Sequence, residues 1–544
     1  MKKNVTVGLL MTSLLIFAGC SSNNSNKTNS KKQDNNKQTL AVVESAELPT
    51  MDISKAVDVV SFSAISQTME GLYEFDDDSI PQPALAKEVV DPTNDGLTYT
   101  ISLKEDGKWS NGEPVTAHDF VYSWQRTVDP ATSSEYAYLF SGIVNADAIT
   151  KSEKKPEELG VKALDDYTLE ISLEKPIPYL NSLLAKPTFY PQNKKAVEEF
   201  GDSYATSSDH LVYNGAFKLD KWDGTNTTWN YVKNDKYRKK KNVKLDEINV
   251  TVVKENGTSL NMYQADEVDI IPVKGEFAQQ QKDNADFVVR EYPSSYYIQY
   301  NFENKLVSNK NLRKAIGYSL NSKEIADTIL GDGSKEINGF VATGILNPKT
   351  GKDFAEESGK LTEYDKKKAQ EYWKAAKLEL GDTPLSFTLL ASDTDSAKKL
   401  AEYVQGQLES TLDGLKVNVS AIPFSNRLDK MSSGDFEVVL AGWSATFADP
   451  VDFLQLANVD ASMNFGKWKN EEYGKIMNDV TTTYAADPDK RWESMLDAHK
   501  LMMEELPYQP LYQSSEAFLV KPKVKGLVYR ALGSPYYKNV SIEN

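Results

Sequence analysis

The sequence predicts an α/β or α+β protein built from two or three domains. Segments typical of strands alternate with amphipathic helical segments along the whole chain, which is the pattern of a mixed fold. The chain has 544 residues, whereas a single hydrophobic core stops growing at about 250–300 residues. Hydrophobic residues make up 40% and charged residues 26% of the chain, a globular rather than a disordered composition.

Individual elements follow from periodicity and capping residues. Apolar residues alternate with threonine and serine at 97–103, which indicates a half-buried strand. Thr116 and Asp119 form a capping box, so a helix is expected to begin there and to end before Asp129-Pro130. The other predicted strands are 40–43, 169–173, 248–253, 385–390, 417–422 and 436–440, and the other predicted helices are 61–72, 312–320, 322–330, 397–412 and 491–505.

Charge and composition exclude several functional classes. The formal net charge is −17, so nonspecific binding to nucleic acid, which needs a basic face, is not expected. With three histidines and one cysteine, the chain has no set of Cys/His zinc ligands and no internal disulfide. His118 and His499 are expected on helix surfaces, and no phosphate-binding glycine loop or complete nucleophile motif occurs. We therefore expect no catalytic residues, no metal and no cofactor.

The N-terminus is typical of an export signal. Lys2 and Lys3 precede an apolar stretch at 5–17, which is too short for a membrane span of about 20 residues. The small residues before Cys20 resemble a bacterial lipobox, which implies cleavage after Gly19 and a lipid on the Cys20 sulfur. The alternative is an ordinary secretory signal that happens to end near a cysteine.

Residues 20–38 are predicted to be a disordered tether. Beyond Cys20 the segment contains only polar residues, mostly asparagine, serine and lysine, and cannot form a core. As a flexible coil it would span on the order of 20–25 Å. Together with residues 1–19 as a lipoprotein signal, this predicts a folded body anchored on the outer face of a bacterial cytoplasmic membrane.

The stretch 108–126 closely resembles the signature of the oligopeptide-binding proteins of ABC importers, the extracytoplasmic solute-binding proteins of the peptide/nickel/opine family. Each further match is weak alone, but all occur in the order of that family and together cover residues 39–544. They are Thr68 to Leu72, Gly160 to Glu170, Asn214 to Phe217, Leu312 to Ile316 and Ala441 to Trp443.

The resemblance implies a periplasmic-binding-protein-like type II fold (cluster C), with two lobes that close on a hinge and an extra inserted domain. Lobe I would comprise residues 39–71, 194–292 and 513–544, the inserted domain residues 72–193, and lobe III residues 293–512. It further implies capture of extended oligopeptides between the lobes and delivery to an ABC permease, with the protein acting as a monomer.

The family also implies where the ligand binds. One edge for the ligand backbone would be Val57-Asp58-Val59 and the other Gly442-Trp443-Ser444, where the glycine allows another backbone to approach closely. Trp443 would wall a side-chain pocket, the alternative being a core tryptophan. Tyr136 and Tyr296 also stand at cleft positions, with ordinary packing as the alternative.

One position departs from the family pattern. Where the best-studied members carry an aspartate that pairs with the α-ammonium of the peptide, this chain has Thr446, which cannot neutralise a charge. Asp449 and Asp58 are candidate replacements, although Asp449 could instead shape the turn before Pro450. We expect a site that does not clamp a free α-amine through residue 446.

Two alternatives to a general peptide receptor remain at the level of sequence. One is a specialised receptor of the same fold for a signalling peptide, a cell-wall peptide or a non-peptide solute. The other is a surface enzyme or adhesin that reuses the fold, against which the missing catalytic machinery counts.

Overall fold

The structure is a computed structural model that describes residues 37–381, 385–459, 461 and 463–543. The predicted signal at 1–19, the lipidation site Cys20 and nearly all of the predicted tether lie outside the described residues. Among the described residues no helix is both long enough and apolar enough to span a membrane.

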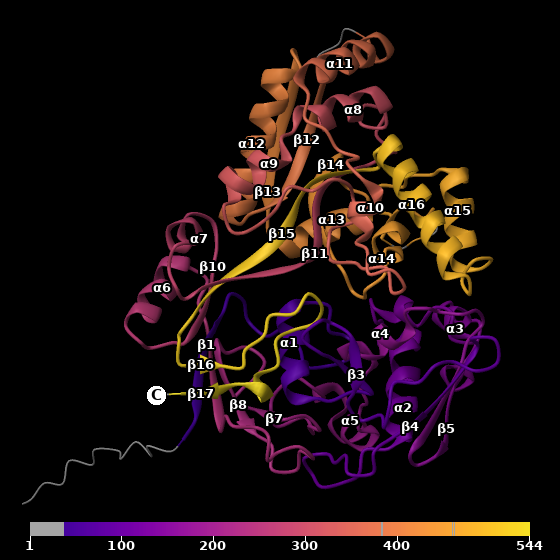
Figure 1. Ribbon diagram of the computed structural model, residues 1–544, viewed down its shortest axis with the longest axis vertical. Helices are drawn as coiled ribbons and strands as arrows, with labels where there is room; N and C mark the ends of the chain where they lie inside the picture. The colour runs from indigo at the N-terminus through magenta and orange to yellow at the C-terminus, as the bar shows by residue number, and fades with distance from the viewer. Residues whose placement is uncertain (1–36, 382–384, 460, 462, 544) are drawn as a thin grey trace, which may run out of the picture. The chain divides into compact units, whose positions relative to one another are not determined.

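Ten strands form one large mixed sheet. They are β1 (Thr39–Glu44), β7 (Phe217–Asp220), β8 (Thr228–Lys233), β9 (Glu247–Val252), β10 (Ile270–Val273), β11 (Phe287–Tyr300), β12 (Leu385–Ser392), β13 (Leu415–Ile422), β14 (Val438–Ser444) and β15 (Tyr508–Val520). Their order in the sheet is β13-β12-β14-β11-β15-β10-β1-β9-β8-β7 (Figure 1). The predicted strands at 40–43, 248–253, 385–390, 417–422 and 436–440 are confirmed as members of this sheet.

The two long strands β11 and β15 connect the two halves of this sheet. They pair antiparallel in two stretches, 287–291 with 515–519 and 295–299 with 508–513, and the register shifts between them. On one side of the shift β11 also pairs with β14, and on the other side β15 pairs with β10. Pro293 lies at the shift, where it donates no ladder hydrogen bond. The sheet is therefore continuous, but of the described strands only β11 and β15 cross its middle.

The segment between β1 and β7 builds sheets of its own. Its strands are β2 (Tyr73–Phe75), β3 (Pro81–Pro83), β4 (Thr98–Ser102), β5 (Val161–Asp165) and β6 (Thr168–Ser172), in a β2-β3 pair and a β4-β6-β5 sheet. The helix predicted from the capping box is α2 (Ala117–Val128), in which Asp119 accepts from the Thr116 backbone at 2.8 Å. Phe120 and Trp124 on α2 are fully buried. None of these strands joins the large sheet; the domain boundaries themselves stay a prediction.

Helices cover the sheets. They are α1 (Val59–Thr68), α3 (Ala146–Thr150), α4 (Leu180–Leu184), α5 (Lys194–Phe200), α6 (Asn256–Gln264), α7 (Gly275–Gln281), α8 (Lys310–Ser319), α9 (Ser322–Glu324), α10 (Phe354–Ser358), α11 (Lys366–Leu380), α12 (Asp395–Thr411), α13 (Phe424–Ser433), α14 (Val451–Leu454), α15 (Glu471–Thr481) and α16 (Pro488–Glu505). In the C-terminal segment, two short strands pair antiparallel: β16 (Val524–Lys525) and β17 (Ser541–Ile542).

Two sequence-based expectations about helices are wrong in detail. The helix expected at 61–72 is α1, which begins at Val59 and ends at Thr68 because Met69 turns extended. Beyond it, a side chain at Gly71 would collide with the Tyr190 ring. His499 is buried rather than on the surface of α16, since its Nε2 accepts from the backbone N–H of Phe340 at 2.9 Å. Burial lowers the pKa of His499 to about 3.

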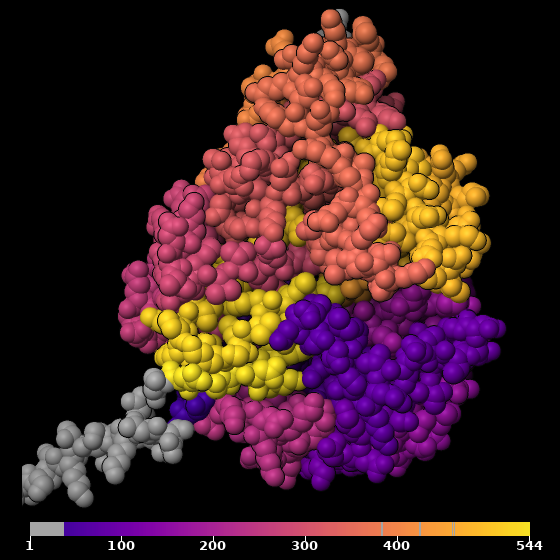
Figure 2. All heavy atoms as spheres, viewed as in Figure 1, coloured from indigo at the N-terminus to yellow at the C-terminus, as the bar shows by residue number. Residues whose placement is uncertain are grey.

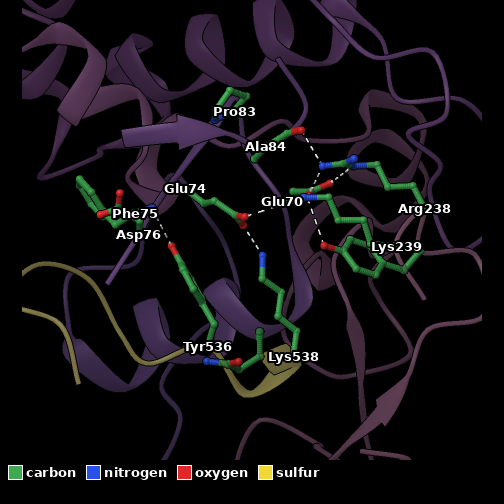
Figure 3. A network of polar contacts seen from close by, with 12 residues as sticks. Glu70, Glu74, Phe75, Asp76, Pro83, Ala84, Arg238, Lys239, Tyr536 and Lys538 are labelled. Atoms are coloured by element: carbon green, nitrogen blue, oxygen red, sulfur yellow. Dashed lines mark hydrogen bonds and ion pairs between the residues drawn. The ribbon is translucent and has the colours of Figure 1, made fainter. Parts of the chain in front are cut away.

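A cluster of buried and half-buried charges, the Glu70 cluster (Glu70, Glu74, Arg238 and Lys538), ties the C-terminal segment to the body (Figure 3). Glu70 accepts from Arg238 through both carboxylate oxygens, at 2.9 and 3.0 Å, and both side chains are 5% exposed. Glu74 pairs with Lys538. Atoms of the C-terminal segment, yellow in Figure 2, lie beside those of the early part of the body, as the hydrogen bond from Gln67 to the Pro535 carbonyl requires.

Candidate functional site

Strand β14 ends in an exposed edge. All seven of its residues pair with β11, but on the other side β12 pairs only with Val438 and Val439. The carbonyl of Leu440 then accepts from Arg427 Nη1 at 2.8 Å instead of from a strand. Beyond that point no described strand pairs with the outer edge at 442–444, where Gly442 and Ser444 are exposed. Unpaired backbone groups of this kind can receive an added strand.

Gly442 and Tyr296, both predicted site residues, are cross-strand partners. A Cβ atom at Gly442 would come within 2.9 Å of the Tyr296 ring, so the close approach that this glycine permits here is that of a tyrosine ring in the same chain. The Tyr296 ring also stacks on Tyr512 with centroids 5.1 Å apart. The stacked rings of Tyr296 and Tyr512 therefore lie beside Gly442 at the free edge of β14.

Trp443 is half-buried and lines a cavity of about 500 Å³. One wall comes from residues 138–147, including Tyr138, and the other from residues 443–481, including Gln455. The indole Nε1–H points at the Asp452 carboxylate, 3.4 Å away. A larger cavity, about 660 Å³, lies among residues 317–364 and 509–511 and contains none of the predicted site residues. We place the candidate site at the smaller cavity, because it adjoins the exposed edge through Trp443.

Thr446 is held by a buried carboxylate and a lysine. Its N–H and its hydroxyl donate to Asp452 at 2.5 and 2.7 Å, and its carbonyl accepts from Lys186 Nζ at 2.9 Å. Asp452 is fully buried, and burial raises its pKa to about 6. The hydrogen bonds from Thr446 act in the opposite direction and lower the pKa by less than burial raises it. Burial lowers the pKa of Lys186 to about 8, partly offset by Asp452. We call Trp443, Thr446, Asp452 and Lys186 the Thr446 corner.

Asp449 is committed to a structural ion pair. Its two carboxylate oxygens accept from Arg491 at 2.7 and 2.9 Å, and both side chains are almost entirely buried. The carboxylate also accepts from the Val451 N–H, which confirms the turn-shaping alternative. Next to this pair, the ring of Phe447 stacks on Tyr179 at 4.2 Å. The charge of Asp449 is therefore paired with Arg491, and three of its four acceptor positions are filled, which leaves it poorly suited to bind an ammonium group.

The second predicted edge differs from expectation at its end. Val57 is 42% and Val59 70% exposed, but Val59 is the first residue of α1 rather than part of an extended edge. Asp58 is the extended N-cap of that helix and accepts from the Ser61 N–H at 2.9 Å. The interaction satisfies one of the unpaired N–H groups at the helix start. Asp58, with φ −121° and ψ 158°, keeps the extended geometry that the prediction needs, and Val59 does not.

Tyr136 links these two regions through aromatic contacts. Its ring meets Phe62 of α1 edge-on at 5.6 Å and stacks on Tyr138 at 5.9 Å. Tyr138 in turn lines the cavity beside Trp443. Burial raises the pKa of Tyr136 to about 12. The described residues show no direct hydrogen bond or ring contact between 57–59 and 442–449.

The structure thus gathers Tyr296 and 442–446 at one edge, with Tyr136 one ring away. Lys186 and Asp452 were missed by sequence reasoning. For Asp452 a signal existed, because an acid stands inside the apolar run Val451 to Leu454. Lys186 gives no such signal. No group of three or more potential metal ligands is found among the described residues. The roles of the predicted residues toward a ligand stay predictions.

Known proteins resemble this chain over almost its whole length. Residues 81–465 match the family described as bacterial extracellular solute-binding proteins, family 5 Middle. The dipeptide-binding protein of Lactococcus lactis subsp. cremoris (strain MG1363) is 34% identical over 509 residues, which cover 90% of this chain and 92% of that protein.

Solved structures give the same result for the fold. Listeria monocytogenes OppA bound to peptide has a TM-score of 0.84 and 43% identity, covering 93% of this chain and 99% of that one. The pheromone receptor PrgZ, whose mode of peptide binding has been described, has a TM-score of 0.85 and 37% identity, covering 93% and 100%. The fold is therefore the periplasmic-binding-protein-like, two-lobed α/β fold that the sequence predicted.

Proposed function

We propose, from the premise that this chain belongs to the bacterial extracellular solute-binding proteins of family 5, that it captures oligopeptides in extended conformation and delivers them to an ABC permease. The single observation that carries the proposal is the exposed outer edge of β14 at 442–444, beyond its pairing with β12.

An exposed strand edge suits a ligand of variable sequence. All peptides share backbone N–H and C=O groups, so an added strand is bound by what every peptide has in common. Side chains of an extended peptide point alternately to either side, and one set would enter the cavity walled by Trp443. Ordered water can fill the unused part of such a cavity. Binding of this kind holds the backbone tightly and selects side chains weakly.

The register shift between β11 and β15 is the proposed hinge. Among the strands that the structure describes, these two alone cross the middle of the large sheet, and Pro293 interrupts their ladder. The predicted domain boundaries at 292/293 and 512/513 fall beside this shift. Ligand contacts on both lobes would favour the closed state by their differential affinity for it. Peptide is therefore expected to reduce the radius of gyration in X-ray scattering; unchanged scattering with bound peptide would contradict a hinge.

The proposed location is the outer face of the cytoplasmic membrane, with the protein anchored through a lipid on Cys20 and acting as a monomer. The support is the lipobox-like sequence before Cys20 and the polar stretch that follows it. Replacement Cys20→Ala should release the protein from the membrane fraction or leave the signal uncleaved. A variant that stays anchored after normal cleavage would contradict this location.

A specialised receptor of the same fold is the second candidate. The favouring observation is that one of the similar structures is a pheromone receptor, whereas another relative is a dipeptide-binding protein. Both names describe proteins that bind peptides, but they do not agree on the length of the bound peptide. An enzymatic role has no support from the Thr446 corner, where the carboxylate is saturated by hydrogen bonds.

Backbone N-methylation tests the proposal directly. Calorimetry on a pentaalanine host, and on the same peptide methylated at one amide at a time, would measure which N–H groups the protein binds. Pairing with the β14 edge predicts at least a tenfold loss at one amide and little change at its neighbour, because successive N–H groups point to opposite sides of a strand. The neighbour is the matched control. Equal effects at all positions would contradict strand pairing.

A further inference from the structure

We infer that Lys186 sets the charge preference of the binding cleft, so that the ligand group beside Thr446 is anionic or neutral and a cationic group is rejected. The inference rests on the proposed capture of peptides and adds the residue that selects among them. It follows from which donors and acceptors of the Thr446 corner are already hydrogen-bonded and which charges there lack an opposite partner.

The ammonium group of Lys186 is incompletely satisfied. It carries three N–H donors, yet the described residues offer it one hydrogen bond, to the Thr446 carbonyl at 2.9 Å. No described carboxylate lies within ion-pair distance of its Nζ; the negative charge of Asp452 acts on it from farther away and partly offsets the effect of burial on its pKa. A half-buried ammonium with unused donors and no counter-charge is costly, and a ligand anion would reduce that cost.

Asp452 cannot serve as a receptor for a cation. Its two carboxylate oxygens already accept from the Thr446 N–H and hydroxyl, from Trp443 Nε1 at 3.4 Å and from Gln455 Nε2 at 3.4 Å. The residue is fully buried. Its charge holds the Trp443–Thr446 loop, and all four of its acceptor positions are used.

Asp449, the other acid of this loop, is also unavailable. Both of its oxygens accept from Arg491. The unused donors at this corner are therefore the two remaining N–H groups of Lys186, and neither carboxylate of the loop is available to them. Lys186, Trp443 and Thr446 are each half-buried and Ser444 is exposed, so part of the corner is accessible to solvent.

Lys186 belongs to the segment between β6 and α5, whereas Thr446 follows β14. The contact joins positions 260 residues apart. The lysine therefore comes from the predicted inserted domain and the loop from predicted lobe III. A ligand carboxylate bound by Lys186 would contact both at once, so charge selection and closure of the cleft would be coupled.

The test is calorimetry on a pentaalanine host in which each position in turn carries Glu, Gln or Lys. For the wild-type protein, at one position the Glu peptide is expected to bind at least tenfold more tightly than the Lys peptide, with Gln in between. Lys186→Met should reduce this ratio to within about threefold, and Lys186→Arg should keep it. Lys162→Met, at an exposed lysine on β5 of the same predicted inserted domain, is the matched control and should leave the ratio unchanged.

Two results would overturn the inference. One is a wild-type protein that binds the Lys peptide as well as the Glu peptide at every position, a result that needs no variant. The other is an unchanged ratio in Lys186→Met; Lys186→Gln repeats the measurement if the methionine variant does not fold. In both cases binding of the host peptide itself would leave the proposed function intact, whereas failure of every peptide to bind would contradict that function instead.

Discussion

The Glu70 cluster and the Thr446 corner both bury charges between distant segments, but they are balanced differently. In the Glu70 cluster each charge has an opposite partner: Glu70 binds Arg238 through two oxygens and Glu74 binds Lys538 (Figure 3). In the Thr446 corner the carboxylate is used up by neutral donors, and the lysine has only a carbonyl.

The difference appears in the pKa values. Burial alone would raise the pKa of Glu74, but the ion pair with Lys538 lowers it below its ordinary value. In the corner burial prevails for both groups, so that the pKa of Asp452 rises to about 6 and that of Lys186 falls to about 8. A complete set of partners marks a joint that holds the fold, whereas a missing partner marks a place that a ligand can complete.

The largest expected effect comes from breaking the closed cluster. Glu70→Gln leaves the Arg238 guanidinium buried without its counter-charge, which should lower the free energy of unfolding by about 3–5 kcal/mol. Denaturation in urea at pH 7 measures it. Glu105→Gln is the control, because its pair with Lys87 is 3.8 Å long and exposed and should matter by less than about 1 kcal/mol. Equal losses in the two variants would show that the Glu70 cluster is not a structural joint.

The stability of the protein in acid depends on a buried group outside both regions, His499, whose contribution must be known before the two regions are compared. His499 has a pKa of about 3 in the folded protein against 6.5 as its ordinary value. Below pH 6.5 only the unfolded chain takes up that proton, so stability should fall by about 1.4 kcal/mol per pH unit as the pH drops from about 6.5 toward 3. His499→Gln should remove this slope in urea denaturation between pH 6.5 and 5. An unchanged slope would assign the acid sensitivity to other groups.

A smaller effect, on affinity rather than stability, is expected at Trp443. If the indole walls a ligand pocket, Trp443→Ala should weaken peptide binding by more than about 1–2 kcal/mol, as for buried aromatic anchors. The melting temperature without peptide should change little, because the side chain is only half-buried. Calorimetry and thermal denaturation on the same sample measure both quantities. A large loss of stability with unaltered affinity would restore the interpretation of Trp443 as a core residue.

The smallest expected effect concerns alkaline pH. Lys186 loses its charge above about pH 8, with the Asp452 carboxylate and the Thr446 carbonyl as the groups that face it. The preference for the Glu over the Lys peptide should therefore fall from tenfold at pH 7 to about threefold or less at pH 9, since the Lys of the peptide stays charged. Lys186→Arg should keep the preference at pH 9. A wild-type preference that persists at pH 9 would assign it to another group.

Sequence patterns predicted the mixed fold and many of its strands, but they missed the elements that depend on long-range pairing. β15 was not predicted, although it pairs with both β10 and β11. β11 was missed too, because Pro293 interrupts a segment that two other strands hold in place. At the site, the motif predicted Gly442 and Trp443 together, and pairing with β11 brings Tyr296 to them.

The sequence by itself determined what depends on neighbours along the chain. The capping box of Thr116 and Asp119 and the turn formed by Asp449 before Pro450 are local hydrogen bonds over two or three residues. Only the tertiary structure decided the partners of the buried charges. Asp449 is paired with Arg491, and Lys186 meets the carbonyl of Thr446 from 260 residues away. The physical reason is that burial and the nearest opposite charge decide how a lysine or an aspartate is used, and both are set by segments that meet only when the chain has folded.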